Sequence, residues 1–251
     1  MTSKCLRIIS TVPSITELLY DLEMEEQVVG ITKFCVHPEE WYRSKTRIGG
    51  TKNLNLEKIM ALQPDLIIAN KEENTKDQIE TLMDYTQVIV TDIKTIEDNI
   101  KLISTLGALL NKEALAQKLS NQLSAVISGL KPVQTASAVY LIWKDPYMTV
   151  GGDSFINHML DCVGFKNVFG HLTRYPEVTI NDIKQKKPQF ILLSSEPFPF
   201  KEKHIAELQN ELPDAKILLV DGEAFSWYGS RIIKKAKYLK SINSKIQTFA
   251  E

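Results

Sequence analysis

The sequence has few of the residues that usually carry metal or redox chemistry. Its 251 residues include only three cysteines and four histidines. The cysteines, Cys5, Cys35 and Cys162, are odd in number and form no C-x-x-C pair, so neither a disulfide framework nor a cysteine-based zinc site is expected. The histidines show no spacing typical of a shared metal ion. We therefore predict no metal site and no intrinsic cofactor.

Long apolar runs and an excess of one charge are also missing. No stretch approaches the ~20 apolar residues of a membrane span. Met1–Lys4 is followed by the short strand-like run Leu6–Ile9, which is too short and too early for the apolar region of a signal peptide. The 30 basic and 31 acidic residues nearly cancel, so there is no basic surplus to bind a phosphate backbone. We expect no nucleic-acid partner, and a cytoplasmic location stays open.

Motifs of common catalytic sites are absent. There is no G-x-S-x-G, no H-E-x-x-H and no Walker loop. The segment Gly151-Gly152-Asp153-Ser154 leads into a helical pattern and has two interpretations. It could hold an anion at the helix N-terminus, or it could be a tight turn with an N-cap, which is the commoner case. We predict that the protein is not an enzyme.

What the chain does have is an alternation of short apolar runs and helical patterns. The runs are rich in Ile, Leu and Val and show little in-and-out alternation, as in parallel strands buried on both faces. Helical stretches between them predict βαβ units, and hence an α/β fold with parallel sheets. The predicted strands are Leu6–Ser10, Val28–Thr32, Leu66–Ala69, Val88–Thr91, Ala138–Ile142, Phe190–Leu193 and Ile217–Val220.

One region contains no predicted strand. Between Thr95 and Leu130 the apolar residues follow two helical stripes, with a joint expected at Asn111–Glu113. A long helix at this place would act as a stiff connector, unlike a Gly/Ser linker. We therefore predict an N-terminal α/β lobe at 1–94, a helical connector at 95–131 and a C-terminal α/β lobe at 132–251.

Several helix ends can be located from capping residues. Ser14-Ile15-Thr16-Glu17, just after Pro13, has the pattern of a capping box. Asn55 is expected to cap the helix that ends before Pro64. Asp153 or Ser154 is expected to cap the helix Phe155–Val163, which Gly164 would close in a left-handed conformation.

The two halves resemble each other at a constant offset of 124 residues. Residues 55–68 read NLEKIMALQPDLII and residues 179–192 read TINDIKQKKPQFIL. Pro64 then matches Pro188, and Glu72 falls on Glu196, just past a predicted strand in each half. The gap-free register favours a duplicated pair of similar lobes.

Ligands of parallel sheets bind beyond the carboxyl ends of the strands. The residues that follow the predicted strands include many aromatic side chains, which offer contact area to a large flat ligand at low entropy cost. The alternative is that about half of them fill the lobe cores. Our candidate ligand-binding residues are Phe34, His37, Asn70, Trp143, Tyr147, Tyr175, Trp227 and Arg231. His37 could contact the ligand or coordinate a metal; because it has no visible partner for a metal site, we favour a hydrogen bond with the ligand.

The order and spacing of these motifs resemble those of periplasmic vitamin B12-binding proteins and of the wider siderophore and B12 receptor family. The matching motifs span nearly the whole chain. They are Arg7-Ile8-Ile9-Ser10, Pro13-Ser14-Ile15-Thr16-Glu17, Val29-Gly30-Ile31-Thr32, His37-Pro38, Asn55–Ile59, Pro64-Asp65-Leu66-Ile67, Gly151–Ser154, Gly164–Phe169 and Ser230-Arg231.

The resemblance implies two Rossmann-like lobes joined by a long rigid helix, a class III periplasmic-binding-protein fold, with the ligand held between the lobes. It implies a solute-binding protein of an ABC importer, in the periplasm or cell envelope, whose partners are the permease subunits. It also implies that acidic residues dock onto permease arginines, and Glu72 and Glu196 are the candidates. We expect a monomer.

Two positions depart from the family pattern. His37 stands where B12 carriers tend to have an aromatic residue, and Asn70 where they have a tryptophan. The ligand is therefore expected to be a cobalamin-like corrinoid or an iron chelate. The alternatives are a cytosolic binder of a corrinoid or metal chelate, and an enzyme on a duplicated Rossmann-like fold.

Overall fold

The computed structural model describes residues 5–130, 132 and 134–247, which form two compact units. Unit 1 comprises the described part of Met1–Ile93 together with Glu97–Asn121 and Tyr228–Arg231. Unit 2 comprises Lys94–Ile96, Gln122–Trp227 and the described part of Ile232–Glu251. The three-part division expected from the sequence stays a prediction. It assigns residues 228–231 to the C-terminal lobe, whereas they pack with unit 1 in the structure.

The sheet of unit 1 is parallel throughout and has its most buried strands at the centre. Its order is β3 (Thr46–Arg47), β2 (Val28–Ile31), β1 (Ile8–Ser10), β6 (Leu66–Asn70) and β7 (Gln87–Thr91). Every residue of β1 and β6 is buried. Parallel strands covered on both faces need apolar residues on both faces, which is why these runs show no alternation. A small antiparallel pair, β4 (Gly49–Gly50) and β5 (Asn53–Leu54), follows β3 in the sequence.

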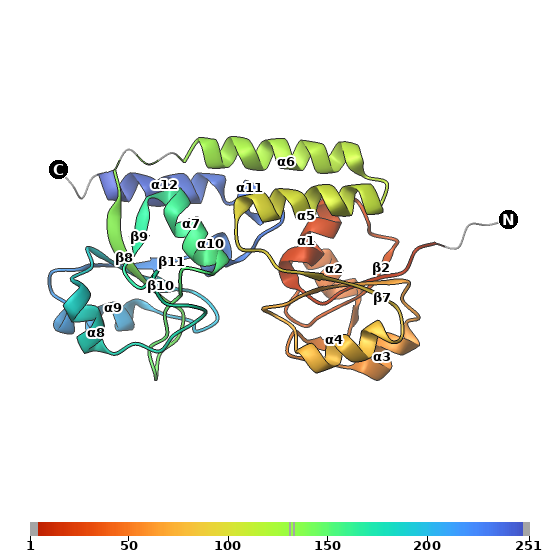
Figure 1. Ribbon diagram of the computed structural model, residues 1–251, viewed down its shortest axis with the longest axis horizontal. Coiled ribbons are helices and arrows are strands. Elements are labelled where there is room, and N and C mark those ends of the chain that lie inside the picture. Colours follow the sequence, from red (N-terminus) through yellow and green to blue (C-terminus); the bar gives the residue numbers. More distant parts are fainter. Residues whose placement is uncertain (1–4, 131, 133, 248–251) are drawn as a thin grey trace. The chain divides into compact units, whose positions relative to one another are not determined.

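Helices cover both faces of this sheet (Figure 1). The elements α3 (Leu56–Ala61) and α4 (Lys76–Met83) lie on one face, where Ile59, Ile79 and Leu82 join the strand residues Ile9 and Ile67 in one apolar cluster. The other face is covered by α1 (Pro13–Asp21) and α5 (Ile96–Leu109). The short helix α2 (Glu39–Ser44) follows β2.

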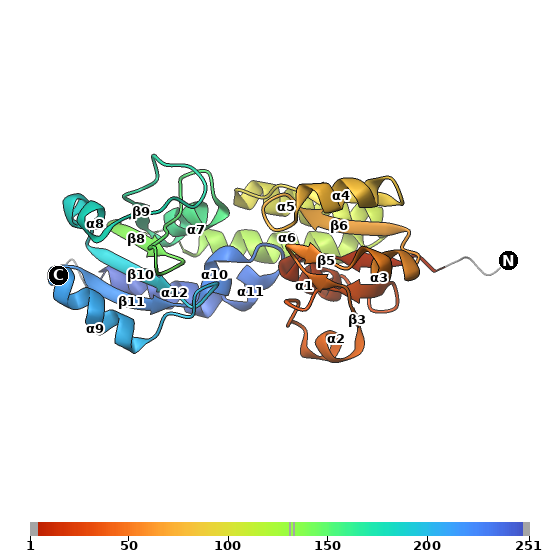
Figure 2. The same ribbon diagram turned by 90° about the horizontal axis from the view of Figure 1, so that it is seen from below.

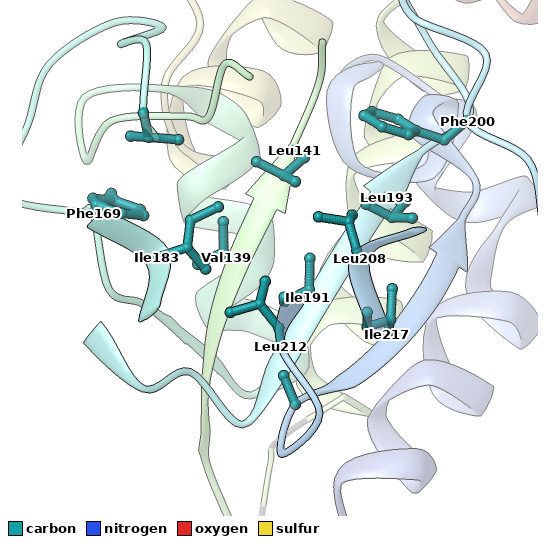
Figure 3. Close-up of a cluster of buried hydrophobic side chains, with 12 residues drawn as sticks. Val139, Leu141, Phe169, Ile183, Ile191, Leu193, Phe200, Leu208, Leu212 and Ile217 are labelled. Atoms are coloured by element: carbon teal, nitrogen blue, oxygen red, sulfur yellow. The ribbon is translucent and has the colours of Figure 1, made fainter. Parts of the chain in front are cut away.

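Unit 2 is built around a second parallel sheet. Its order is β11 (Lys216–Val220), β10 (Phe190–Ser194), β8 (Ala136–Leu141) and β9 (Phe165–Asn167). The helices α8 (Ile180–Lys186) and α9 (Glu202–Glu211) pack on one face (Figure 3), and α7 (Phe155–Val163) and α12 (Ala236–Gln247) lie on the other (Figure 1). Two short helices, α10 (Gly222–Ser226) and α11 (Arg231–Lys234), precede α12.

The internal repeat seen in the sequence recurs in the structure. The strand order β2-β1-β6-β7 of unit 1 corresponds to β9-β8-β10-β11 of unit 2. At the offset of 124 residues, Leu56 and Ile180 each begin a helix. At the same offset β6 coincides with β10 over its whole length, from Leu66 to Asn70. Glu72 and Glu196 therefore each lie two residues beyond the end of equivalent strands. The two parallel sheets with their helices confirm the predicted α/β fold.

Two antiparallel helices make up the predicted connector (Figure 2). Helix α5 is followed by α6 (Glu113–Ser128), with the break at Leu110–Lys112, where Asn111 has a positive φ of 56°. The helices touch closely, since a Cβ on Gly107 would lie 2.3 Å from the Cβ of Ala116. The chain leaves unit 1 for unit 2 inside α6, after Asn121. This boundary, one of several between the two units, therefore falls inside a helix rather than in a loose linker.

Most of the predicted helix caps are confirmed, and one is wrong. Asn55 accepts a hydrogen bond from the backbone of Lys58 at 2.9 Å, Ser154 caps α7 in the same way, and Gly164 closes α7 with a φ of 101°. The capping box at Ser14–Glu17 does not form. Helix α1 begins at Pro13, and its N-cap Val12 makes no side-chain capping bond. Ser14 and Glu17 are instead buried, and the Glu17 carboxylate pairs with Arg231 rather than with the helix N-terminus.

Candidate functional site

The carboxyl ends of β6 and β7 are joined by a network of buried amides and hydroxyls. Asn70 is only 2% exposed. Its Nδ2 donates to the Thr91 hydroxyl at 3.1 Å, and its Oδ1 accepts from the backbone N–H of Glu72 at 2.8 Å. Asn74 accepts at 2.8 Å from the hydroxyl of Thr11, which follows β1. The Asn70 amide thus ties the loop that carries Glu72 to the end of β7, and the side chain lies beneath the surface.

Tyr228 adds an aromatic ring to this network from a distant part of the sequence. It is 4% exposed, and burial, followed by the negative charge of Glu73, raises the pKa of its hydroxyl, while Ser14, Thr91 and Asn70 lower it as hydrogen-bonding neighbours. Sequence reasoning did not select Tyr228, because nothing local shows that a residue after β11 packs into the first sheet.

The neighbouring segment is fixed by an ion pair inside unit 1. Arg231 Nε lies 2.7 Å from Glu17 Oε2, with side-chain exposures of 7% and 4%. The backbone N–H of Gly229 donates to Asn99 at 2.7 Å, and the Asn99 amide donates back to the Gly229 carbonyl at 3.1 Å. Arg231, a predicted ligand-binding residue, is therefore buried against α1. Its guanidinium is thus already engaged by a buried carboxylate of the same unit.

The loop after β2 presents an exposed aromatic ring on a rigid base. Cys35 is fully buried, and its sulfur lies 3.1 Å from the hydroxyls of both Thr16 and Thr32. Phe34 beside it is 50% exposed, and its ring lies against the backbone of Gly50, where a Cβ would come within 3.2 Å. The Lys33 ammonium lies 5.0 Å from the centre of the Phe34 ring. His37 is partly buried in the same loop.

In unit 2 the loop after β8 ends in an aromatic cluster. Trp143 is 40% exposed and meets Phe198 edge to face, with ring centres 5.7 Å apart. Phe198 in turn contacts Phe200 at 4.7 Å, and both rings contact His204. The Nδ1 of His204 accepts from the backbone N–H of Lys201 at 2.8 Å, which fixes the start of α9. Trp143 is thus the exposed outer member of a cluster of aromatic rings packed edge to face.

Isolated β-bridges bring the segments that carry Tyr147 and Tyr175 close to Trp143. Met148 bridges Trp143 on one side and Glu177 on the other, so the segments that carry the two tyrosines run together. Both tyrosines are partly buried. Tyr147 packs against the apolar cluster of the sheet, and burial raises the pKa of its hydroxyl.

The Gly151-Gly152 pair is a site of close backbone approach. A Cβ on Gly152 would lie 2.1 Å from the Gly170 carbonyl oxygen. The N–H groups of Gly151 and Gly152 already donate to the carbonyls of Arg174 and Leu172, at 2.7 and 2.9 Å. These N–H groups are therefore not available to an anion, and the interpretation as a turn followed by an N-cap is confirmed by Ser154.

Trp227 and Glu196 meet at the carboxyl ends of β10 and β11. Trp227 is 8% exposed, and its indole Nε1 donates to Glu196 Oε1 at 3.0 Å. Burial, the largest effect, raises the pKa of Glu196, and the negative charges of Glu223 and Asp221 add to it, while the hydrogen bonds from Ser226 and Trp227 oppose it. Glu72 is also partly buried, with its carbonyl accepting from the Lys52 ammonium at 2.6 Å.

Each unit thus gathers predicted residues at the carboxyl edge of its own sheet. Unit 1 brings Phe34 and His37 together in one loop and Asn70 and Glu72 in another. Unit 2 brings Trp143 together with Tyr147. Among residues 5–130, 132 and 134–247, no three His, Cys, Asp or Glu side chains are grouped to hold a metal ion. Over the same ranges, no helix has both the length and the apolar character to cross a membrane.

Comparison with known proteins identifies the class of protein to which this chain belongs. The model of the periplasmic binding protein family matches residues 8–216. The chain belongs to this family, whose members are substrate-binding proteins for transport, and the resemblance found in the sequence is confirmed.

Individual relatives agree with this assignment. A vitamin B12-binding protein of Vibrio campbellii is 25% identical over 82% of this chain and 77% of its own length. A substrate-binding lipoprotein of an ABC transporter in Bacillus subtilis is 29% identical over 74% of this chain and 62% of its own. The solved periplasmic vitamin B12-binding protein of Vibrio cholerae superposes with a TM-score of 0.82 at 21% identity, covering 96% of this chain and 97% of that one. The apo haem-binding protein of Roseiflexus gives the same TM-score at 18% identity, covering 95% and 97%. These two superpositions show the fold.

Proposed function

We propose that this protein is the solute-binding component of an ABC importer, and that it binds a cobalamin-like corrinoid or an iron chelate such as haem or a ferric siderophore. Phe34 and Trp143 carry the proposal. Both are large aromatic side chains, 50% and 40% exposed, that follow the carboxyl end of a parallel strand and rest on a rigid base. An exposed ring that costs little entropy to immobilise suits a broad, rigid ligand. Family membership and the names of the relatives support the same class of ligand.

The candidate residues fall into three roles. Phe34 and Trp143 contact the flat faces of the ligand, and His37, Tyr147, Tyr175 and Trp227 supply hydrogen bonds or ring edges around it. Asn70 and Arg231 act from beneath the surface, since the first holds the loop that bears Glu72 and the second neutralises Glu17. In this proposal the protein binds and releases its ligand and performs no chemistry on it.

Docking to the importer is assigned to Glu72 and Glu196. They follow equivalent strands at the same distance, so a pair of similar permease subunits could meet them in the same way. Carboxylates at such positions steer association with arginine-bearing partners and set its orientation. We infer a monomer that works at the cell envelope, as the relatives described as periplasmic or as lipoproteins do. A cytosolic binder has no observation in its favour.

A titration of the purified protein tests the proposal. Cyanocobalamin, haemin and ferrichrome are added in turn and followed by visible absorbance and calorimetry. One-to-one binding to one of them is expected. Phe34→Ala and Trp143→Ala should each weaken it by about tenfold or more, the usual loss on truncating an aromatic anchor. Tyr85→Ala is the control, because Tyr85 is 44% exposed but precedes β7, at the opposite end of the sheet.

Two results would contradict the proposal. If none of the three probes binds, the chelate class is wrong. If one probe binds but neither aromatic variant weakens it relative to Tyr85→Ala, the ligand does not rest on these rings.

A further inference from the structure

The side chain of Glu196 faces inward, toward two groups of the segment that follows β11. Its Oε1 accepts a hydrogen bond from the Ser226 hydroxyl at 3.0 Å and another from the Trp227 indole Nε1, also at 3.0 Å. The Glu196 residue is only partly exposed, and Trp227 is 8% exposed. One carboxylate oxygen thus fixes where the indole N–H points, and with it the orientation of the ring.

Glycine at position 222 is what allows this geometry. A Cβ on Gly222 would lie 2.4 Å from the Glu196 Cγ and 2.6 Å from the Ser194 Oγ. The Gly222 N–H donates to the Ser195 hydroxyl at 2.9 Å, and the Ser194 hydroxyl donates to the Glu196 carbonyl at 2.6 Å. The backbone at the start of α10 therefore packs directly on the side chains of the loop after β10, and the Glu196 side chain lies within reach of Trp227.

The charges around Glu196 show that it is not held by an ion pair. Lys235 lies 2.6 Å from Asp221 and 3.7 Å from Glu223, so this cation serves the two neighbouring acids. In the described part of the chain, no Lys or Arg pairs with Glu196, and Oε2 receives no hydrogen bond. A carboxylate that is desolvated without a cation is costly unless its hydrogen bonds are used. Here those bonds go to an indole and a hydroxyl, not to a charge.

We propose that Glu196 is a positioning residue, which holds the Trp227 ring in the orientation that the ligand meets. This rests on the proposed function, in which Trp227 contacts the ligand. It gives the two oxygens separate roles, because Oε1 orients Trp227 and Oε2 is left for the importer. The acceptor oxygen at Oε1, rather than the negative charge, is what ligand binding requires.

Three variants separate acceptor from charge. Glu196→Gln keeps an oxygen acceptor and loses the charge, Glu196→Ala loses both, and Trp227→Phe removes the N–H donor but keeps a ring. With whichever of cyanocobalamin, haemin or ferrichrome binds, Glu196→Ala and Trp227→Phe should each weaken binding about tenfold, the value of one hydrogen bond, whereas Glu196→Gln should stay within about threefold. The double variant Glu196→Ala/Trp227→Phe should bind no more weakly than the single variant with the lower affinity, because both changes remove the same hydrogen bond.

A spectroscopic measurement reads the ring position without any ligand. The chain has three tryptophans, so a ¹⁵N-resolved NMR spectrum contains three indole N–H signals, and Trp227→Phe identifies the one from Trp227. Glu196→Ala should shift that signal and leave the other two in place, and Glu196→Gln should shift it less.

Different failures have different meanings. Additive losses in the double variant, or equal losses for Gln and Ala, would overturn the positioning role. An unmoved Trp227 signal in Glu196→Ala would overturn it even if no probe binds. Failure of the wild-type protein to bind any probe, with the signal shifted as expected, would refute the proposed function while Glu196 still orients Trp227.

Discussion

Arg231 offers a sharp test of whether a residue predicted to bind ligand is instead part of the protein's framework. Replacing it with methionine leaves the Glu17 carboxylate, 4% exposed, without the guanidinium that lies 2.7 Å away. Removing one partner of a buried ion pair costs about 3–5 kcal/mol, because the remaining charge stays desolvated. That is a large share of the roughly 5–15 kcal/mol by which folded proteins are stable.

The assay is urea denaturation followed by far-UV circular dichroism. Arg231→Met should lower the free energy of unfolding by about 3–5 kcal/mol, and the double variant Glu17→Met/Arg231→Met should recover most of it, since replacing both charges with apolar groups is often neutral. Lys237→Met, at an exposed cation of α12, is the control and should stay within about 0.5 kcal/mol. Wild-type stability in Arg231→Met, together with weakened ligand binding, would refute the reasoning and make Arg231 a ligand contact.

Three further outcomes can be checked directly. Burial raises the pKa of the Cys35 thiol to about 11, so at pH 8 a thiol reagent should label the exposed Cys5 at once and Cys35 only after unfolding. Gly107→Ala should lower the melting temperature, because overpacking of about 1–3 kcal/mol against Ala116 exceeds the gain of about 1 kcal/mol in helix propensity; a raised melting temperature would show that α5 and α6 separate easily. Burial raises the pKa of Glu196, so the contribution of this group to stability is present at low pH and lost as the pH rises through the folded-state pKa. Glu196→Gln should therefore be more stable than the wild-type protein at pH 7, and the difference should shrink toward pH 4.

Much of the fold was predictable because its signals are local. The strands β6 and β10 are apolar runs that end next to polar loops, and each is preceded by a helix and a proline. All seven predicted strands are present, shifted by at most two residues at either end. The short strands β3, β4, β5 and β9 were not predicted, because two or three residues are too few for a hydrophobic period to show.

The candidate site was less predictable, since contacts with residues far away in the sequence decide which of its side chains are buried and which are exposed. Ser14–Glu17 has the local pattern of a capping box, but Glu17 is committed to Arg231, more than 200 residues further along the chain. Trp143 and Trp227 look alike in the sequence, as aromatic residues near the ends of strands. Only the structure shows that the first is exposed beside Phe198 and the second is buried beside Glu196.

The assignment of residues 228–231 to unit 1 has a consequence for how the protein is made. A ribosome has finished the rest of unit 1 when it passes Asn121, yet the ring of Tyr228 and the guanidinium of Arg231 do not exist until roughly 110 residues later. At about 5–20 residues per second, that delay lasts on the order of 5–20 s. During this interval the Glu17 carboxylate lacks the guanidinium that lies beside it in the folded protein, so the packing around α1 is completed only when nearly the last helix has been synthesised.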